Sequence, residues 1–155
     1  MISDRKEHLE ALEKKISSLS NSIRTFRLVG SMGKKARRAI MEELRKTADV
    51  NSPICLLATA SLIGEGVDIP RFDTLVLAMP ISFKGRMVQY AGRLQRKYPG
   101  KKDIVIYDYL DTCSGLTISM YRKRVQAYRN MGYQVHAPEQ SVIANRGTQA
   151  SLFGS

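Results

Sequence analysis

Three arginines and one amide recur on one side of a helix predicted over residues 84–96. With about 100° between successive residues, one side of this helix carries Arg86, Gln89, Arg93 and Arg96. The opposite side carries Met87, Ala91 and Leu94, which predicts a packed apolar face. Arginines on one side of a helix repel one another unless an anion binds between them. A planar guanidinium group can donate two parallel hydrogen bonds to two oxygens of one phosphate. The pattern therefore indicates phosphate recognition, with an ordinary solvated basic face as the alternative.

A second group of polar side chains lies in a loop predicted over residues 58–70. Thr59 and Ser61 are hydroxyl donors of the kind that contact a phosphodiester backbone. Gly64 and Gly66 permit a close approach of a ligand, and Asp68 could accept a hydrogen bond from a ribose hydroxyl. Taken alone, these residues are equally compatible with a glycine-containing turn that binds nothing.

The charge of the chain favours an anionic partner. Lys and Arg number 25 against 14 Asp and Glu, so the net charge is +11. The charge is also segregated, because residues 84–102 contain Lys84, Arg86, Arg93, Arg96, Lys97, Lys101 and Lys102 and no acid. No apolar run approaches the roughly 20 residues that span a bilayer, so a membrane partner is not expected. Cys55 and Cys113 are expected to be reduced thiols, and no metal-ligand spacing occurs around them.

Helices and strands are predicted to alternate along the chain. Periodic apolar residues predict helices over residues 4–19, 34–48, 84–96 and 116–131. Short apolar runs predict strands over residues 23–29, 53–58, 74–79, 103–109 and 133–136. The second helix should pack through Ala36, Ile40 and Leu44. This alternation is typical of an α/β fold with a parallel sheet covered on both faces, and ligands of such sheets bind beyond the carboxyl ends of the strands.

The two polar groups together resemble motifs V and VI of superfamily 2 helicases. Gln89, Gly92, Arg93 and Arg96 match the pattern Q-x-x-G-R-x-x-R of motif VI, and Gly66 with Asp68 matches the Gly-x-Asp element of motif V. Residues 3–5 resemble the end of motif IV, and residues 30–33, with the basic helix that follows them, resemble the family's loop after the next strand. Over residues 1–135 the chain is similar to the carboxy-terminal RecA-like domain of DEAD/DEAH-box-related helicases, and most similar to their DNA-repair and restriction-type branch.

The resemblance implies a three-layer RecA-like domain over residues 1–135, followed by a flexible tail over residues 136–155. It also implies a first strand ahead of Ser3, of which only Met1 and Ile2 remain. The implied function is that of the second motor domain of an ATP-dependent helicase or translocase. Its implied partners are nucleic acid, DNA rather than RNA, and an amino-terminal RecA-like motor domain, in the cytoplasm.

The resemblance also assigns roles to individual residues. Arg93 and Arg96 would act as arginine fingers on the γ-phosphate of ATP, with Gln89 orienting water or phosphate. Gly66 and Asp68 would couple the nucleotide to the nucleic-acid track. The phosphates of one strand would be held by Gly30, Ser31, Met32, Gly33, Thr59 and Ser61. ATP would bind with Mg²⁺, and the amino-terminal motor domain would hold the metal.

Two helicase motifs are absent from this sequence. It has no G-x-x-x-x-G-K-[ST] phosphate loop and no Asp-Glu pair for magnesium. The isolated chain is therefore expected not to hydrolyse ATP. The alternative function is that of a stand-alone basic nucleic-acid-binding module without ATPase activity.

Overall fold

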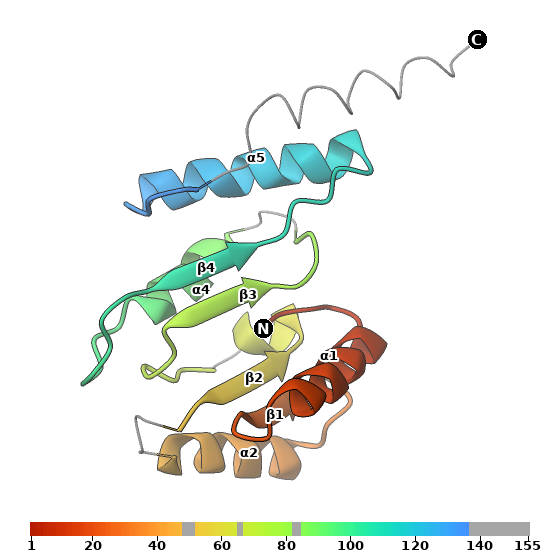
Figure 1. Cartoon of the computed structure of the whole chain (residues 1–155), viewed down its shortest axis with the longest axis vertical. Coiled ribbons are helices and arrows are strands. Elements are labelled where there is room, and N and C mark those ends of the chain that lie inside the picture. The colour runs from red at the N-terminus through yellow and green to blue at the C-terminus, as the bar shows by residue number, and fades with distance from the viewer. Residues whose placement is uncertain (48–51, 65–66, 82–84, 137–155) are drawn as a thin grey trace. The chain divides into compact units, whose positions relative to one another are not determined.

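The computed structural model describes residues 1–47, 52–64, 67–81 and 85–136. Parallel strands alternate with helices, as predicted (Figure 1). In chain order the elements are α1 (Lys6–Leu19), β1 (Arg24–Leu28), α2 (Lys34–Lys46), β2 (Ile54–Ala58), α3 (Ala60–Gly64), β3 (Thr74–Leu77), α4 (Arg86–Leu94), β4 (Val105–Asp108) and α5 (Gly115–Asn130).

The structure differs from the predicted elements in two places. A one-turn helix, α3, forms within the predicted loop after β2, because the Thr59 carbonyl accepts hydrogen bonds from the amides of Leu62 and Ile63. The strand predicted over residues 133–136 does not form. Gly132 ends α5 with a φ of +85°, and the amide of Tyr133 then donates to the Tyr128 carbonyl. The chain thus turns back on the helix end, which prevents it from running on as a strand.

Ile2 joins two pairs of strands. β1 pairs with β2 and β3 pairs with β4, both in parallel. Ile2 bridges in parallel to Ala58, the last residue of β2, and to Leu77 of β3. The order across the sheet is therefore β1, β2, the Ile2 segment, β3 and β4, and Figure 1 shows the amino terminus between β2 and β3.

Helices cover both faces of the β1–β2 pair. On one face, Phe26 and Leu28 pack in a cluster that includes Met41 and Leu44 of α2. On the other face, Arg27 forms ion pairs with two glutamates of α1, Glu10 at 2.7 Å and Glu13 at 3.3 Å. Alternate residues of β1 therefore face opposite helix layers, as the pleat of a strand requires. The predicted apolar stripe of α2 is wrong at its amino end, because Ala36 is exposed and the buried residues are Met41 and Leu44.

The chain divides into two compact units, which are described separately. The first comprises residues 1–79 and 89–108, and contains the sheet. The second comprises residues 80–88 and 109–155, and its described core is built on α5 by Ile118, Tyr121 and Val125. Arg124 is buried within this unit and donates to the Ile81 carbonyl at 2.8 Å, so it does not belong to a basic surface. Among the described residues, no helix is both long and apolar enough to cross a membrane.

Candidate functional site

The carboxyl edge of the first unit's sheet gathers the predicted site segments. The amide of Thr59, directly after β2, donates to the carbonyl of Leu28 at the end of β1. The amide of Ala60 donates to the Asp4 carboxylate at 3.0 Å. Asp4 follows the Ile2 segment, so the ends of three neighbouring strand segments are held together by hydrogen bonds. In parallel sheets this edge is where ligands bind.

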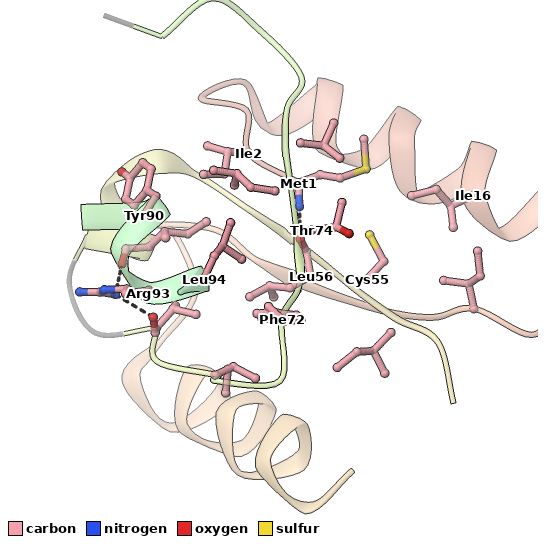
Figure 2. A pocket seen from close by; sticks show the side chains of 17 residues that line it. Met1, Ile2, Ile16, Cys55, Leu56, Phe72, Thr74, Tyr90, Arg93 and Leu94 are labelled. Atoms are coloured by element: carbon pink, nitrogen blue, oxygen red, sulfur yellow. Dashed lines mark hydrogen bonds between the residues drawn. The ribbon is translucent and has the colours of Figure 1, made fainter. Parts of the chain in front are cut away.

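Helix α4 presents a buried face and positions Arg93 beside it. Tyr90, Ala91 and Leu94 are almost completely buried, because they lie together on one side of the helix. Arg93 is half-buried, and its Nη1 donates to the Ile63 carbonyl at 2.5 Å and to the Val67 carbonyl at 2.7 Å (Figure 2). Arg93 therefore ties α4 to the segment that carries the Gly-x-Asp element.

The helical wheel placed Arg93 on the polar side of the helix, opposite Ala91 and Leu94, but gave no sign of its two backbone partners. The wheel places side chains relative to one helix axis only, whereas the two carbonyl partners come from a different segment of the chain. The predicted apolar face is correct at Ala91 and Leu94. The side chains of Arg86 and Met87 lie outside what the structure describes.

Arg96 and Asp68 form an ion pair between Nη1 and Oδ2, with both side chains partly exposed. The second carboxylate oxygen, Oδ1 of Asp68, is buried and has no hydrogen-bond partner among the described residues. A buried carboxylate oxygen without a donor is costly, and a ligand hydroxyl could satisfy it. Gly66, the other predicted residue of this element, lies outside the described residues.

Gln89 and Gly92 lie on the exposed side of α4. A side chain added at Gly92 would meet nothing within 4 Å, so the surface beside Arg93 and Arg96 is open to a ligand. Gln89 and Gly92 thus lie on the predicted polar face, whereas Arg96 lies beyond the end of α4 at Leu94, because the helix ends two residues earlier than predicted.

The turn after β1 exposes three of its four predicted residues. Gly30, Ser31 and Gly33 are exposed, whereas the side chain of Met32 packs against the core cluster. Gly33 precedes α2, so the amides of the helix's first turn face this edge next to two exposed lysines, Lys34 and Lys35.

The two predicted hydroxyl donors after β2 differ in exposure. Thr59 is buried, and its Oγ1 lies 3.4 Å from the Oγ of Ser61. Ser61 is exposed. Only Ser61 therefore offers its hydroxyl directly to a ligand in this structure.

Tyr90 is a positioning residue that the helical-wheel analysis did not single out. It is buried, and its hydroxyl donates to the Ala60 carbonyl at 2.5 Å, beside Thr59. The signal available in the sequence was its spacing of four from Leu94, which places both residues on one helix face.

The side chains on this edge fit the phosphates and hydroxyls of a nucleotide. Arg96 supplies guanidinium donors, and Asp68 supplies an acceptor for a hydroxyl. No group of three or more His, Cys, Asp or Glu residues that could hold a metal occurs in the part of the chain that the structure describes.

A family comparison matches the helicase conserved C-terminal domain to residues 1–98, which is most of the chain. The chain belongs to this family. It is 26% identical over 144 residues to a protein of Escherichia phage T5 named "Probable helicase D10", and the match covers 92% of this chain. The chain spans only 30% of the length of that relative.

Two solved structures share the fold of this helicase domain. One is the C-terminal part of the Fun30 ATPase domain, with a TM-score of 0.58 and 19% identity over 78% of this chain and 37% of that one. The other is the C-terminal domain of a Dbp5 variant from S. cerevisiae, with a TM-score of 0.56 and 17% identity over 83% of this chain and 67% of that one. These two matches show the RecA-like α/β fold, and the family match shows the helicase C-terminal domain, both as predicted.

Proposed function

We propose that this chain acts as the second motor domain of an ATP-dependent nucleic-acid helicase or translocase and supplies two arginines to ATP. The observation that carries the proposal is that Arg93 of α4 and Arg96, just after α4, both contact the Gly-x-Asp segment at the carboxyl edge of the sheet. There Asp68 presents a buried acceptor oxygen beside an open surface.

Arg96 is the arginine that can move to a phosphate at little cost. Its ion pair with Asp68 is about half exposed, and such pairs contribute roughly 0–1 kcal/mol. A γ-phosphate offers the guanidinium two oxygens in the same planar geometry, with more negative charge than a carboxylate. Binding of ATP would therefore exchange one anion for another and release Asp68.

Arg93 acts from a more restrained position. Its Nη1 is held by two backbone carbonyls, which fixes the guanidinium between α4 and the segment leading to Asp68. A phosphate contact at Arg93 would therefore be transmitted to that segment, and we assign Arg93 and Asp68 to the coupling between nucleotide and track. Gly66 would share this role by its place in the sequence, and Gln89 would orient water or phosphate from the exposed side of α4.

The nucleic-acid track is assigned to the exposed groups of the same edge. Ser31, Ser61 and the backbone of Gly30 and Gly33 offer hydroxyl and amide donors, and the exposed lysines that follow add positive charge. Contacts of these types position a phosphate backbone without reading its bases. We assign DNA rather than RNA as the polymer, on the resemblance to the DNA-repair branch. Thr59 would support Ser61, because its own hydroxyl is buried.

When bound, ATP carries the scissile γ-phosphate and its Mg²⁺, and an amino-terminal motor domain would hold the metal. The residues of this chain would bind the phosphate, orient it and stabilise the charge that develops on it.

The test is nucleic-acid-stimulated ATP turnover by a two-domain protein that contains this domain. Arg96→Ala is expected to lower turnover by about 10³-fold or more, because arginine fingers contribute about 10³–10⁵ in rate. Lys14→Ala, an exposed cation on α1, is the matched control and should leave turnover unchanged. Turnover that survives Arg96→Ala would refute the assignment and favour a binding module without a motor role.

A further inference from the structure

The ammonium group of Lys101 is bonded inward, to three backbone carbonyls. Its Nζ donates to the carbonyl of Pro70 at 3.1 Å, to that of Arg96 at 3.2 Å and to that of Leu94. An ammonium group has three donors, so these three acceptors use all of them. The neighbouring Lys102 is exposed instead. Lys101 therefore links segments of the first unit to one another and does not add to its basic surface.

Arg96 is not held by a helix, because α4 ends two residues before it, at Leu94. The amide of Arg96 donates to the Arg93 carbonyl at 3.4 Å, which is longer than is usual for such a bond. The carbonyls of a helix's last turn have no partner within the helix, and a cation beside them is favourable. The contacts of Lys101 with the Leu94 and Arg96 carbonyls therefore support the chain where the helix no longer does.

The third acceptor, the Pro70 carbonyl, belongs to a segment that is anchored on both sides. Nη1 of Arg71 donates to the Thr47 carbonyl directly after α2 at 2.6 Å, and Nη2 donates to the Ser52 carbonyl ahead of β2. Ile69, on the other side of Pro70, is buried in the core cluster of the first unit. The Pro70 carbonyl is therefore a fixed point against which another segment can be held.

A tight turn returns Lys101 to the end of α4. Gly100 has a φ of +83°, a conformation that favours glycine, and the amide of Lys101 donates to the Tyr98 carbonyl at 3.1 Å. This turn reverses the chain and brings the ammonium group to the two carbonyls that lie five and seven positions earlier.

Arg96 and the Gly-x-Asp segment are thus connected twice. The side-chain connection is the ion pair of Arg96 with Asp68, which is partly exposed. The backbone connection runs from the Arg96 carbonyl through Lys101 to Pro70, two residues after Asp68. A phosphate that takes the guanidinium of Arg96 from Asp68 breaks the first connection and leaves the second intact.

Lys101 and Arg71 also line a cavity of about 220 Å³, together with Asp73 and Tyr98. Burial lowers the pKa of the Lys101 ammonium group, and the Asp73 carboxylate partly offsets this effect. An anion in the cavity would have to take a donor of Lys101 from a carbonyl, and a carbonyl left unpaired there is costly. The contacts therefore favour a positioning role for Lys101 over an anion-binding role.

We propose that Lys101 is the positioning residue of the arginine finger: it fixes the backbone of Arg96 to the Pro70 carbonyl, so that the guanidinium meets the γ-phosphate when Asp68 releases it. This role rests on the proposed function of Arg96. A catalytic group that is misplaced by about 1 Å can cost about 100-fold in rate, so the backbone that carries a finger has to be fixed. Lys101 itself would not touch ATP, because its donors are used on carbonyls.

The first test measures the positioning without ATP, by amide hydrogen exchange in the full chain followed by NMR. Lys101→Met keeps the length of the side chain and removes its donors. The amides of Gln95 and Arg96, which bond to the last turn of α4, are expected to exchange about fivefold faster or more. The Ser20 amide, which bonds in the same way at the end of α1, should keep its rate. Lys102→Met, at the exposed neighbouring lysine, is the matched control variant and should change none of these rates.

The second test measures nucleic-acid-stimulated ATP turnover by a two-domain protein that contains this domain. Lys101→Met is expected to lower kcat about tenfold or more and to change the KM for ATP less than about twofold, because a finger acts in the transition state. In a protein that already carries Arg96→Ala, the same change should lower kcat less than about twofold, because the residue that Lys101 positions is gone. A merely structural role would give the same factor in both backgrounds, since loss of folded protein does not depend on Arg96.

Lys101→Arg keeps the experiment decisive if Lys101→Met does not fold. It retains the charge, but a planar guanidinium cannot direct its donors at three carbonyls around one atom as an ammonium group does. Its effect on kcat is expected to be smaller and to disappear in the same way in the Arg96→Ala background.

Two results would overturn the role of Lys101 alone. One is unchanged exchange of the Gln95 and Arg96 amides in Lys101→Met. The other is an unchanged kcat, or a fall in kcat by the same factor with and without Arg96→Ala. In both cases Arg96→Ala by itself still lowers turnover, so the proposed function stands. Turnover that survives Arg96→Ala overturns the proposed function together with this role.

Discussion

Replacing Arg93 by alanine tests whether this arginine is structural as well as functional. The change removes two hydrogen bonds, from Nη1 to the carbonyls of Ile63 and Val67. Hydrogen bonds from a charged donor contribute about 1.5–3 kcal/mol each, and half-burial of the side chain reduces this, so we expect a loss of about 2 kcal/mol in the free energy of unfolding. For a chain of this size, that corresponds to a fall in melting temperature of about 4–8 °C.

Arg96→Ala is the matched control in the same assay, which is thermal and urea unfolding followed by circular dichroism. Its ion pair with Asp68 is exposed, so the expected loss of stability is about 0–1 kcal/mol. Arg93→Lys should recover only part of the loss, because an ammonium group lacks the rigid fork of a guanidinium. If Arg93→Ala melts at the wild-type temperature, or if Arg96→Ala is the more destabilising of the two, the structural role assigned to Arg93 is wrong.

Four further outcomes are expected. The purified chain should show no ATP turnover, because it lacks a phosphate loop, and turnover that Arg93→Ala abolishes would contradict this. Its affinity for nucleic acid should be independent of sequence and fall with salt at a slope of about −0.7 to −0.9 per contacted phosphate, and a salt-independent affinity would refute the track. Leu94→Ala should lower the free energy of unfolding by about 2–5 kcal/mol, whereas Gln89→Ala, on the exposed side of α4, should leave it unchanged within about 0.5 kcal/mol. Burial lowers the pKa of the Met1 amino group below 8.0, so the unfolded chain binds more protons there than the folded chain. The free energy of unfolding should therefore rise with pH toward 8, and acetylation of this amino group should remove that rise. A rise that acetylation leaves unchanged would contradict the burial.

The local elements were predictable from the sequence because their signals are local. Apolar periodicity located α1, α2, α4 and α5, and short apolar runs located the four strands. The spacing of Gln89, Gly92, Arg93 and Arg96 identified the helicase motif, because such a motif is recognised from residue types and their spacing along the chain alone. The alternation of these elements also indicated a parallel sheet, which the structure confirms.

Long-range pairing was decided only by the tertiary structure. No pattern around Arg93 indicates that its partners are the carbonyls of Ile63 and Val67, about thirty positions earlier in the chain. Nor does any pattern show that Asp68 has one oxygen on Arg96 and the other buried without a partner among the described residues. Backbone carbonyls are identical in every residue, so which of them a side chain meets depends on how the segments pack.

The position of the Ile2 segment between β2 and β3 has the same origin. The sequence indicated that Met1 and Ile2 belong to a strand, but a strand's neighbours are set by the three-dimensional order of the sheet, which differs from the order along the chain. Hydrogen bonds of Met1 and Ser3 with Ala58, and of Ile2 with Val76 and Ala78, place this segment between β2 and β3. Local propensity determines which residues become strands and helices, whereas burial and backbone pairing between distant segments determine where a ligand can bind.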